Sequence, residues 1–433
     1  FLVLLDNDDE LHVDALRCVG DALSTNPDCD YLYSDENKIS PGGDHFDEFL
    51  KPVWSPERLL AQNYTSHLSV LRRSVVDDVG RFRPGFDGSQ DYDLVLRVVE
   101  RARRVIHVPH VLYHWRSLPT STASAASAKP YAFVAAIKAV EEHLQRTGVR
   151  AAVSEAGPSL ARVRRASAYH PKISIIVPID NSRQRVFGVE TSLAANVARS
   201  LAESTTYNNY VVRFVAMEDI DHELLTRLNS TLEGRATFVP SRGKELAQAL
   251  NTGLVDCSTQ HAVLLDPRCE IVDGDWLETL IGYVTRPDVA AVAPFLLDHF
   301  GIVKSAGIGT VPVPHEIGAG RHPSDLGPVG MFAIAREVFG VSTRCALVDV
   351  AALKSVGGFS PEYSTRCMDV DLAFKLHRAG LHAIVTPIAR VRCADDIGST
   401  EVDDEIIEAR WGRYFNRDPY TRVDTRLRVP LSA

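Results

Sequence analysis

The sequence predicts an α/β protein built from two copies of one module, each with a mainly parallel sheet flanked by helices. Two observations lead to this prediction: short motifs recur in the same order in both halves of the chain, and strands alternate with helices in the second half. Hydrophobic residues make up 45% of the 433 residues, which is enough for a separate core in each copy.

Four short segments of the first half recur in the same order in the second half. Each half has an apolar run ending in Leu-Leu-Asp, then Val-Gly-x-Phe, then Asp-x-Asp-Leu, and then a proline 18 residues after the first aspartate of that segment. The shared order and the identical last spacing predict two copies of one module. The pairs are 4–6 and 264–266, 79–82 and 356–359, 90–94 and 368–372, and Pro109 and Pro387.

The second copy opens with a buried strand over 173–178. A helix over 190–203 and strands over 210–215 and 236–239 follow, and this alternation is typical of a parallel sheet. The first copy has only five residues before the aspartate of its Leu-Leu-Asp segment. We therefore expect the first copy to be incomplete and to lack the half that binds the nucleotide.

The segment between the copies predicts the domain boundaries. Residues 117–128 are rich in Ser, Thr and Ala, which indicates a flexible loop, and apolar residues at helical spacing over 129–147 predict an amphipathic helix that Gly148 ends. We expect a first domain over 1–147, an irregular linker over 148–171 and a second domain over 172–433.

Charge and cysteine content restrict the possible partners. The net charge is -9 without a dense basic run, which argues against nucleic-acid binding. Seven cysteines without a Cys-x-x-Cys pair fit a reducing cytoplasm. The sequence has no stretch of about 18 apolar residues, so it predicts no transmembrane segment. Basic clusters at 101–104 and 162–165 leave peripheral association with the inner face of a membrane open.

The first candidate site is the acidic segment Asp6-Asn7-Asp8-Asp9 at the end of the first apolar run. Ligands of open α/β sheets bind at the carboxyl ends of strands, and carboxylates there suit a hard divalent cation held together with phosphates. The alternating acids Asp6 and Asp8 are the predicted ligands. The alternative is an Asp-rich turn that caps a helix over 12–23.

Two further segments carry candidate residues. Asp91 stands at the start of a predicted helix and is a candidate general base, although N-capping explains an aspartate there equally well. His114 ends a predicted strand and is either a metal ligand or a structural histidine, and Arg116 has the guanidinium fork that binds phosphates.

The order of these segments resembles family 2 glycosyltransferases of the GT-A fold, in particular rhamnosyltransferase-like, polysaccharide-building members with tandem modules. Each matching segment is short, and the set is specific only when taken together. The matches are Asp6 with Asp8, Tyr33-Ser34-Asp35-Glu36, Lys51-Pro52-Val53-Trp54-Ser55-Pro56, Gln62-Asn63-Tyr64, Gln90-Asp91-Tyr92-Asp93 and Tyr113-His114-Trp115-Arg116.

The resemblance implies an inverting transfer of a sugar from a nucleoside-diphosphate sugar to a glycan or lipid-linked acceptor, in cell-surface polysaccharide synthesis. It implies a Mg²⁺ or Mn²⁺ ion on the donor diphosphate and a proton-accepting base. The implied metal ligands are Asp6, Asp8 and His114, the implied donor-binding residues are Asp9 and Arg116, and the implied base is Asp91. The implied acceptor-binding residues are Trp54, Tyr64 and Asp93. Core packing or helix capping is the alternative for these last three.

The second copy departs from the first at several of these positions. The acidic segment becomes Asp266-Pro267-Arg268-Cys269, so a cation replaces a metal-binding carboxylate, and Arg392 stands where His114 stands in the first copy. We therefore expect an inactive second module. A wholly inactive scaffold is the first alternative for the chain, and a nucleotidyltransferase is the second, although it would need a Gly-rich phosphate loop that the sequence does not contain.

Overall fold

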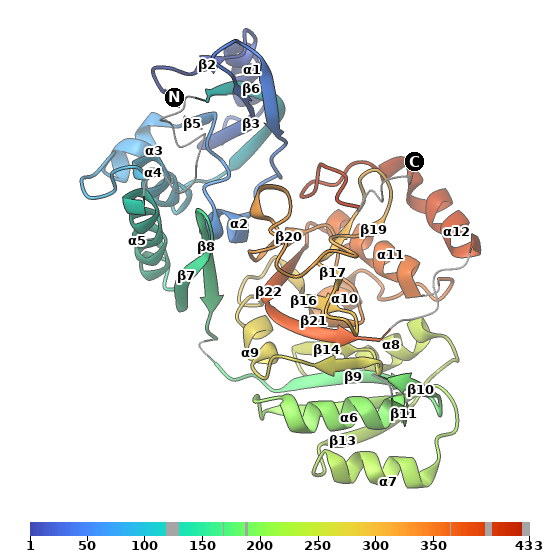
Figure 1. The fold of residues 1–433 in the computed structure, drawn as a ribbon. Helices are drawn as coiled ribbons and strands as arrows, with labels where there is room; N and C mark the ends of the chain where they lie inside the picture. Colours follow the sequence, from blue (N-terminus) through green and yellow to red (C-terminus); the bar gives the residue numbers. More distant parts are fainter. Residues whose placement is uncertain (118–129, 168, 187–188, 364, 395–400, 427–433) are drawn as a thin grey trace. The chain divides into compact units, whose positions relative to one another are not determined.

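A computed structural model describes residues 1–117, 130–167, 169–186, 189–363, 365–394 and 401–426. The chain divides into two compact units (Figure 1). The first comprises Phe1–Arg164 with Val329–Ile334, and the second comprises Arg165–Pro328 with Ala335–Ala433. Nearly all of the loop predicted over 117–128 lies outside the described residues. Within the described part of the chain, no helix combines the length and the apolar character needed to cross a membrane.

The first unit contains a six-stranded sheet in the order β1-β5-β3-β6-β2, with β4 paired to β3. Only β3 and β6 run parallel, and the other pairs are antiparallel. The strands are β1 (Leu2–Leu4), β2 (Glu10–Leu11), β3 (Tyr31–Ile39), β4 (His45–Phe49), β5 (Ser69–Leu71) and β6 (Val105–Arg116), and the helices are α1 (Ala15–Thr25), α2 (Pro56–Ala61), α3 (Arg73–Asp78), α4 (Gln90–Val99) and α5 (Pro130–Arg146).

The second unit contains a ten-stranded sheet in the order β13-β12-β9-β14-β21-β16-β22-β15, with β17 paired to β16 and β20 to β22. The strands β13, β12, β9 and β14 run parallel, whereas β21 is antiparallel to both of its neighbours. The strands are β9 (Ile173–Ile179), β12 (Tyr210–Ala216), β13 (Ala236–Pro240), β14 (His261–Leu265), β15 (Cys269–Ile271), β16 (Val289–Leu297), β17 (Val303–Ser305), β20 (Arg336–Val338), β21 (Cys345–Asp349) and β22 (His382–Cys393).

Smaller elements complete the second unit. Two short hairpins, β10 (Arg183–Val186) with β11 (Val189–Ser192) and β18 (Ile308–Gly309) with β19 (His315–Glu316), lie apart from the large sheet. The helices are α6 (Leu193–Ser204), α7 (His222–Thr231), α8 (Leu246–Val255), α9 (Trp276–Ile281), α10 (Val350–Ser355), α11 (Thr365–Arg378) and α12 (Glu401–Trp411), with 3₁₀ turns η1 (Pro328–Gly330) and η2 (Gly412–Tyr414).

Alternation along β9 explains how the second core is layered. Ile173, Ile175 and Val177 pack with α6 and α7 in the largest hydrophobic core, while Ile176 on the other face lies against α8. Because both faces of the parallel strands are covered, β9 and β14 are buried along their whole length. The predicted strands of this region are confirmed within one residue at their ends.

The structure corrects three predictions. Both sheets are mixed rather than mainly parallel. The sequence does not reveal this, because an apolar run such as β5 or β21 carries no information about the direction of the strand. The helix expected over 190–203 begins only at Leu193, because Val189–Ser192 forms β11 and the Ser192 side chain caps α6. The expected irregular linker over 148–171 contains a hairpin, β7 (Ala151–Gly157) with β8 (Leu160–Arg165), whose apolar side chains pack on the first core.

Two glycines inside helices provide a matched test of this packing. A Cβ at Gly20 of α1 would meet nothing within 4 Å, whereas one at Gly253 of α8 would collide with Ile176 of β9 and approach Val215 of β12. We expect Gly20→Ala to raise the free energy of unfolding by about 0.5–1 kcal/mol. We expect Gly253→Ala to lower it by roughly 1–3 kcal/mol. Urea unfolding followed by circular dichroism measures both, and a change of the same sign in the two variants would contradict the packing described for α8.

Candidate metal centre

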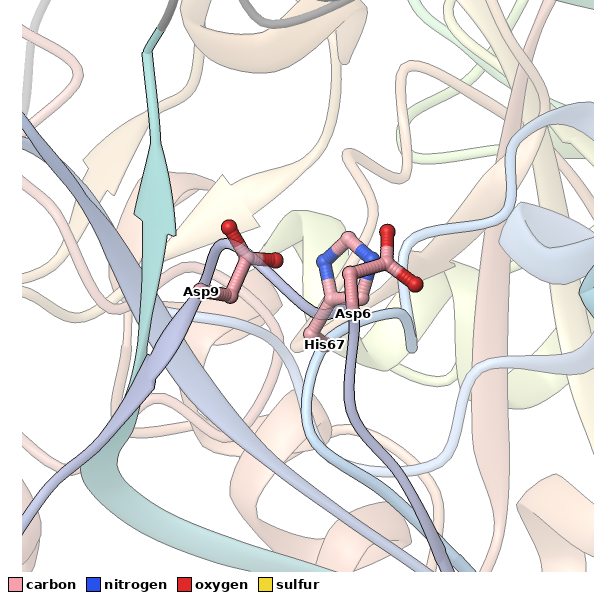
Figure 2. A group of neighbouring side chains, drawn as sticks. All are labelled: Asp6, Asp9 and His67. Carbon is pink, nitrogen blue, oxygen red and sulfur yellow. The ribbon is translucent and has the colours of Figure 1, made fainter.

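Three possible metal ligands converge beside the end of β1 in the first unit. Asp6, Asp9 and His67 each offer a ligand atom, and these atoms all lie within 4.8 Å of one another (Figure 2). The two aspartates belong to a tight turn between β1 and β2, closed by a hydrogen bond from Asp9 N to Asp6 O of 3.3 Å. His67 comes two residues before β5, and the antiparallel pairing of β1 with β5 brings it beside this turn.

Side chains and backbone of β6 hold the acidic turn in place. The hydroxyl of Tyr113 accepts a hydrogen bond from Asp6 N at 3.3 Å and donates to the Asp9 carboxylate. The backbone N–H of Arg116 donates to Asp9 Oδ1 at 2.8 Å, and its guanidinium donates to Asp8 O at 2.6 Å and forms an ion pair with Glu10. The sequence predicted Arg116 as a phosphate ligand, but in the structure its side chain is bound to the turn.

Burial raises the pKa of Asp9, and the nearby charge of Asp8 adds to this effect. Hydrogen bonds from Tyr113 and Arg116 and the charge of His67 offset only part of the increase. A desolvated carboxylate beside other carboxylates is stabilised by a cation at the same place. The donor set of two carboxylates and one imidazole therefore fits a divalent metal ion.

Glu36 orients the third ligand, His67. Its carboxylate oxygen Oε2 lies 3.2 Å from His67 Nδ1 and accepts from the His67 backbone N–H, and the buried Lys51 ammonium lies 3.4 Å from the same oxygen. Burial alone would lower the pKa of His67, but the hydrogen bond and charge of Glu36 outweigh it and raise the pKa. If Nδ1 donates to Glu36, the neutral ring keeps its lone pair on Nε2, the atom left for a metal.

Two of the predicted metal ligands, Asp8 and His114, lie outside this group. Asp8 is exposed and outside the group, because residues 6–9 form a turn, which brings positions 6 and 9 together rather than 6 and 8. His114 is also outside the group, because side chains alternate along β6. The ring of Tyr113 stacks on that of His67, with 4.6 Å between the ring centroids, whereas His114 contacts Asn37 and His45.

Asp91, the predicted base, lies in the first turn of α4. Asn63 Nδ2 donates a hydrogen bond of 2.9 Å to Asp91 Oδ2. The charge of Asp91 is one of the causes that raise the pKa of His67, which places this carboxylate within electrostatic reach of the metal group. The arrangement leaves the other carboxylate oxygen, Oδ1, as the candidate proton acceptor.

Two of the three predicted acceptor-binding residues have structural roles. Tyr64 is 1% exposed, packs edge-on against Tyr33, and its hydroxyl accepts from Ser55 N at 2.8 Å. Asp93 is also 1% exposed. Burial would raise the pKa of Asp93, but hydrogen bonds from Arg83 at 3.0 Å and Arg97 at 2.7 Å outweigh it and lower the pKa. Trp54 packs half-buried against the same core and stays a prediction.

Sequence reasoning missed His67, Glu36 and Tyr113 as parts of this centre. Glu36 and Tyr113 fall within segments that matched the family, but nothing in those segments assigned them a contact with the acidic turn. His67 lies just after the matched Gln62-Asn63-Tyr64 segment and immediately before a short apolar run. A histidine that precedes the strand paired with β1 is the signal that would have found it.

The second unit places different side chains at the equivalent positions. Leu4 pairs with Ser69 across β1 and β5, and Leu264, its counterpart, pairs with Ala346 across β14 and β21. His67 lies two residues before Ser69 and Arg344 two residues before Ala346, so Arg344 corresponds to His67. Arg268 Nε binds Asp266 Oδ1 at 2.9 Å, so a guanidinium occupies the surroundings of this carboxylate.

Asp369 of the second unit corresponds to Asp91 but is buried. It accepts hydrogen bonds from Ser342 Oγ at 3.2 Å and from the Thr343 backbone N–H at 3.1 Å. Burial raises its pKa to about 7, although the bonds from Thr343 and the charge of Arg344 oppose the increase. Together with Asp266 and Arg268, Asp369 lines a small cavity at the end of β14.

The chain is similar in sequence to several known proteins, and no family model matches it. It is 32% identical over 410 residues to an uncharacterized protein, y4gI, of Sinorhizobium fredii, with 90% of this chain and 43% of the relative covered. It is 30% identical over 399 residues to the O-antigen biosynthesis protein RfbC of Myxococcus xanthus, with 90% and 30% covered. It is 34% identical over 147 residues to the pre-mycofactocin glycosyltransferase of Mycobacterium tuberculosis, with 34% and 29% covered.

The chain spans less than half the length of each of these relatives. Among solved structures, it resembles a mannosyltransferase of Pyrobaculum calidifontis in complex with GDP-Man and Mn²⁺ (TM-score 0.37, 19% identity, 54% of this chain and 59% of that chain). It also resembles GalNAc-T7 with UDP, GalNAc and Mn²⁺ (TM-score 0.44, 10% identity, 60% and 51%). One of these relatives is named an O-antigen biosynthesis protein and another a glycosyltransferase.

The buried Asp369 carboxylate makes the stability of the second unit depend on pH. Because its folded pKa of about 7 is above the usual value of 3.8, the folded state binds the proton more tightly, and stability falls as the pH rises between about 4 and 7. Asp369→Asn removes this loss and raises the stability at pH 8 by at most about 4 kcal/mol. Thermal unfolding of both proteins from pH 4 to pH 8 measures the effect, and parallel pH profiles would contradict it.

Proposed function

We propose that the first unit carries the metal centre and the base of an inverting glycosyltransferase. This enzyme moves a sugar from a nucleoside-diphosphate sugar to a glycan or lipid-linked acceptor in cell-surface polysaccharide synthesis. The observation that supports this proposal is the convergence of Asp6, Asp9 and His67 at a strand end, with Asp91 in electrostatic reach. The similarity to an O-antigen biosynthesis protein supports the polysaccharide product.

The proposed ligands are Asp6, Asp9 and His67, with Mn²⁺ or Mg²⁺ as the ion. Carboxylates suit both ions, while the imidazole favours Mn²⁺ because Mg²⁺ prefers oxygen ligands and keeps several waters. When bound, the ion neutralises the negative charge of the departing diphosphate.

The protein's own groups orient the ligands and take up the proton. Tyr113 and the Arg116 backbone hold the acidic turn, and Glu36 holds the His67 ring. Asn63 holds one oxygen of Asp91, and the other oxygen accepts the proton of the acceptor hydroxyl as that hydroxyl attacks the sugar. Attack opposite the leaving diphosphate inverts the configuration of the sugar carbon.

We further propose a tandem family 2 arrangement with GT-A modules, in which the second unit is not catalytic. The matching register of β1 with β5 and of β14 with β21 supports a common module. Arginines at positions 268 and 344 and the burial of Asp369 support the loss of activity in the second unit. The seven free cysteines support a location in the cytoplasm, with attachment at the inner face of the membrane as the route to a lipid-linked acceptor.

Metal binding distinguishes the two units. We expect the full chain to bind one Mn²⁺ that Asp6→Asn and His67→Ala each weaken by at least about tenfold, because each removes a ligand. Asp266→Asn, the same change in the second unit, is the matched control and leaves the affinity unchanged. Titration followed by the electron paramagnetic resonance signal of free Mn²⁺ measures the affinity. An equal loss in Asp266→Asn and Asp6→Asn would contradict the assignment.

The base is tested by the rate of transfer. With a panel of nucleotide sugars as donors, we expect Asp91→Asn to lower kcat by about 10²–10⁴-fold. The Mn²⁺ affinity and the KM for the donor stay nearly unchanged, because the carboxamide keeps the hydrogen bond with Asn63 through its oxygen. Asp369→Asn is the control in the other unit. A transfer rate that Asp91→Asn does not alter would remove the base assignment, and no turnover of any donor by the wild type would favour a scaffold.

A further inference from the structure

Four basic side chains of the second unit line one open groove, which we name the basic groove. It lies where the end of α11 meets the end of α12 and the turn η2, and the two helices pack against one another (Figure 1). The groove has a volume of about 460 Å³, and every charged side chain that lines it is a cation. Its walls include Lys375, Arg378, Arg410, Trp411, Arg413 and Tyr414.

Two of the four cations are balanced by carboxylates. Lys375 Nζ lies 2.8 Å from Asp371 Oδ2, and Arg410 Nη1 lies 2.9 Å from Glu362 Oε1. Asp371 is buried and also accepts a hydrogen bond of 2.8 Å from Trp411 Nε1, which connects α11 with the end of α12. These side chains fix the shape of the groove.

The other two cations, Arg378 and Arg413, are exposed and contact aromatic rings. The Arg378 guanidinium lies 5.8 Å from the centre of the Trp411 ring, and the Arg413 guanidinium lies 4.7 Å from the centre of the Tyr414 ring. Neither arginine forms an ion pair with a carboxylate of the described residues. Because an aromatic ring holds a guanidinium without neutralising it, the groove presents two unbalanced positive charges.

Stabilisation of the helix ends explains only part of this arrangement. Arg378 and Arg410 stand in the last turns of α11 and α12, where a cation interacts favourably with the helix dipole. Arg413 lies in η2, beyond the end of α12, so the dipole of that helix does not account for it. Cations that converge in one groove repel one another, and an anion bound there relieves the repulsion.

The basic cluster that the sequence indicates at 101–104 is less available to an anion. Arg103 lies 2.7 Å from Asp30, and this pair neutralises one of its charges. Arg104 lies 3.5 Å from Asp28. The basic groove combines residues of two helices and a turn, so no run of basic residues in the sequence reveals it.

We infer that the basic groove is the surface by which the chain attaches to a membrane that contains anionic lipids. Each Lys or Arg near such a membrane adds to the attraction, and the half-buried Tyr414 has the apolar ring and polar tip that suit the headgroup region. Two unbalanced charges are few for a nucleic acid, which is bound by neutralising many phosphates. The choice of a membrane rests on the proposed function, in which a lipid-linked glycan is one of the acceptors.

The test is co-sedimentation of the full chain with lipid vesicles. We expect binding to vesicles of equal parts of phosphatidylcholine and phosphatidylglycerol, no binding to phosphatidylcholine alone, and weaker binding as the salt concentration rises. The double variant Arg378→Gln/Arg413→Gln weakens binding to the mixed vesicles by about 25-fold, which is about fivefold for each charge removed. The double variant Arg378→Lys/Arg413→Lys keeps both charges and most of the affinity.

The matched control is the double variant Arg101→Gln/Arg227→Gln, which removes the same charge from two exposed arginines outside the groove. It binds the mixed vesicles like the wild type. An equal loss in both Gln double variants would overturn the inference, since the net charge alone would explain it. Equal binding to phosphatidylcholine vesicles would also overturn it. So would complete displacement by inorganic phosphate at constant ionic strength, because the groove would then be a site for a soluble anion.

The vesicle assay needs neither donor nor Mn²⁺, so its result is independent of the proposed metal centre. Asp6→Asn binds vesicles like the wild type. A wild type that binds Mn²⁺ at the acidic turn but does not bind the mixed vesicles would overturn this inference and leave the proposed function standing. Thermal unfolding checks that each variant is folded. If the Gln double variant fails to fold, the single variant Arg413→Gln provides the test, with an expected loss of about fivefold.

Discussion

The antiparallel pairing of β1 with β5 is the constraint on which the candidate centre depends. Leu4 pairs with Ser69, so the turn that follows β1 and the residues that precede β5 meet at the same end of the sheet. Asp6 and His67 are far apart in the sequence, and no local interaction brings them together. The hydrogen bonds from Tyr113 and Arg116 then hold the turn at this position, since β6 passes beside it. One strand pairing and one neighbouring strand thus determine the whole arrangement.

The second unit keeps this pairing and changes the chemistry. Leu265 pairs with Cys345, which again brings a strand-end aspartate beside the segment that precedes the paired strand. There, however, Arg268 binds Asp266, and Arg344 replaces the histidine. A guanidinium carries its positive charge permanently, so it neutralises the carboxylate without a metal. The backbone geometry of a site and its charge can therefore diverge independently. The same strand pairing carries a candidate metal centre in one unit and an internal ion pair in the other.

Much of the fold could be predicted from the sequence because buried strands and repeated motifs are local signals. The strand over 173–178, the strands near 210 and 236 and the acidic end of β1 needed no tertiary information. The ligand set did need it. The candidate group contains Asp9 and not Asp8 because the acidic segment is a turn, and it contains His67 because a partner strand supplies it. Tyr64 is buried in the first hydrophobic core, and Asp93 is buried against Arg83 and Arg97; a motif reveals neither packing arrangement.

Side-chain alternation along β6 decides which of its residues reach the acidic turn. Tyr113 lies toward the acidic turn, and His114, the next residue, lies toward Asn37 and His45. A motif that contains both residues consecutively does not reveal this difference, because adjacent side chains of a strand point to opposite faces. Which residue of β6 contacts the acidic turn therefore follows from the position of the strand in the sheet.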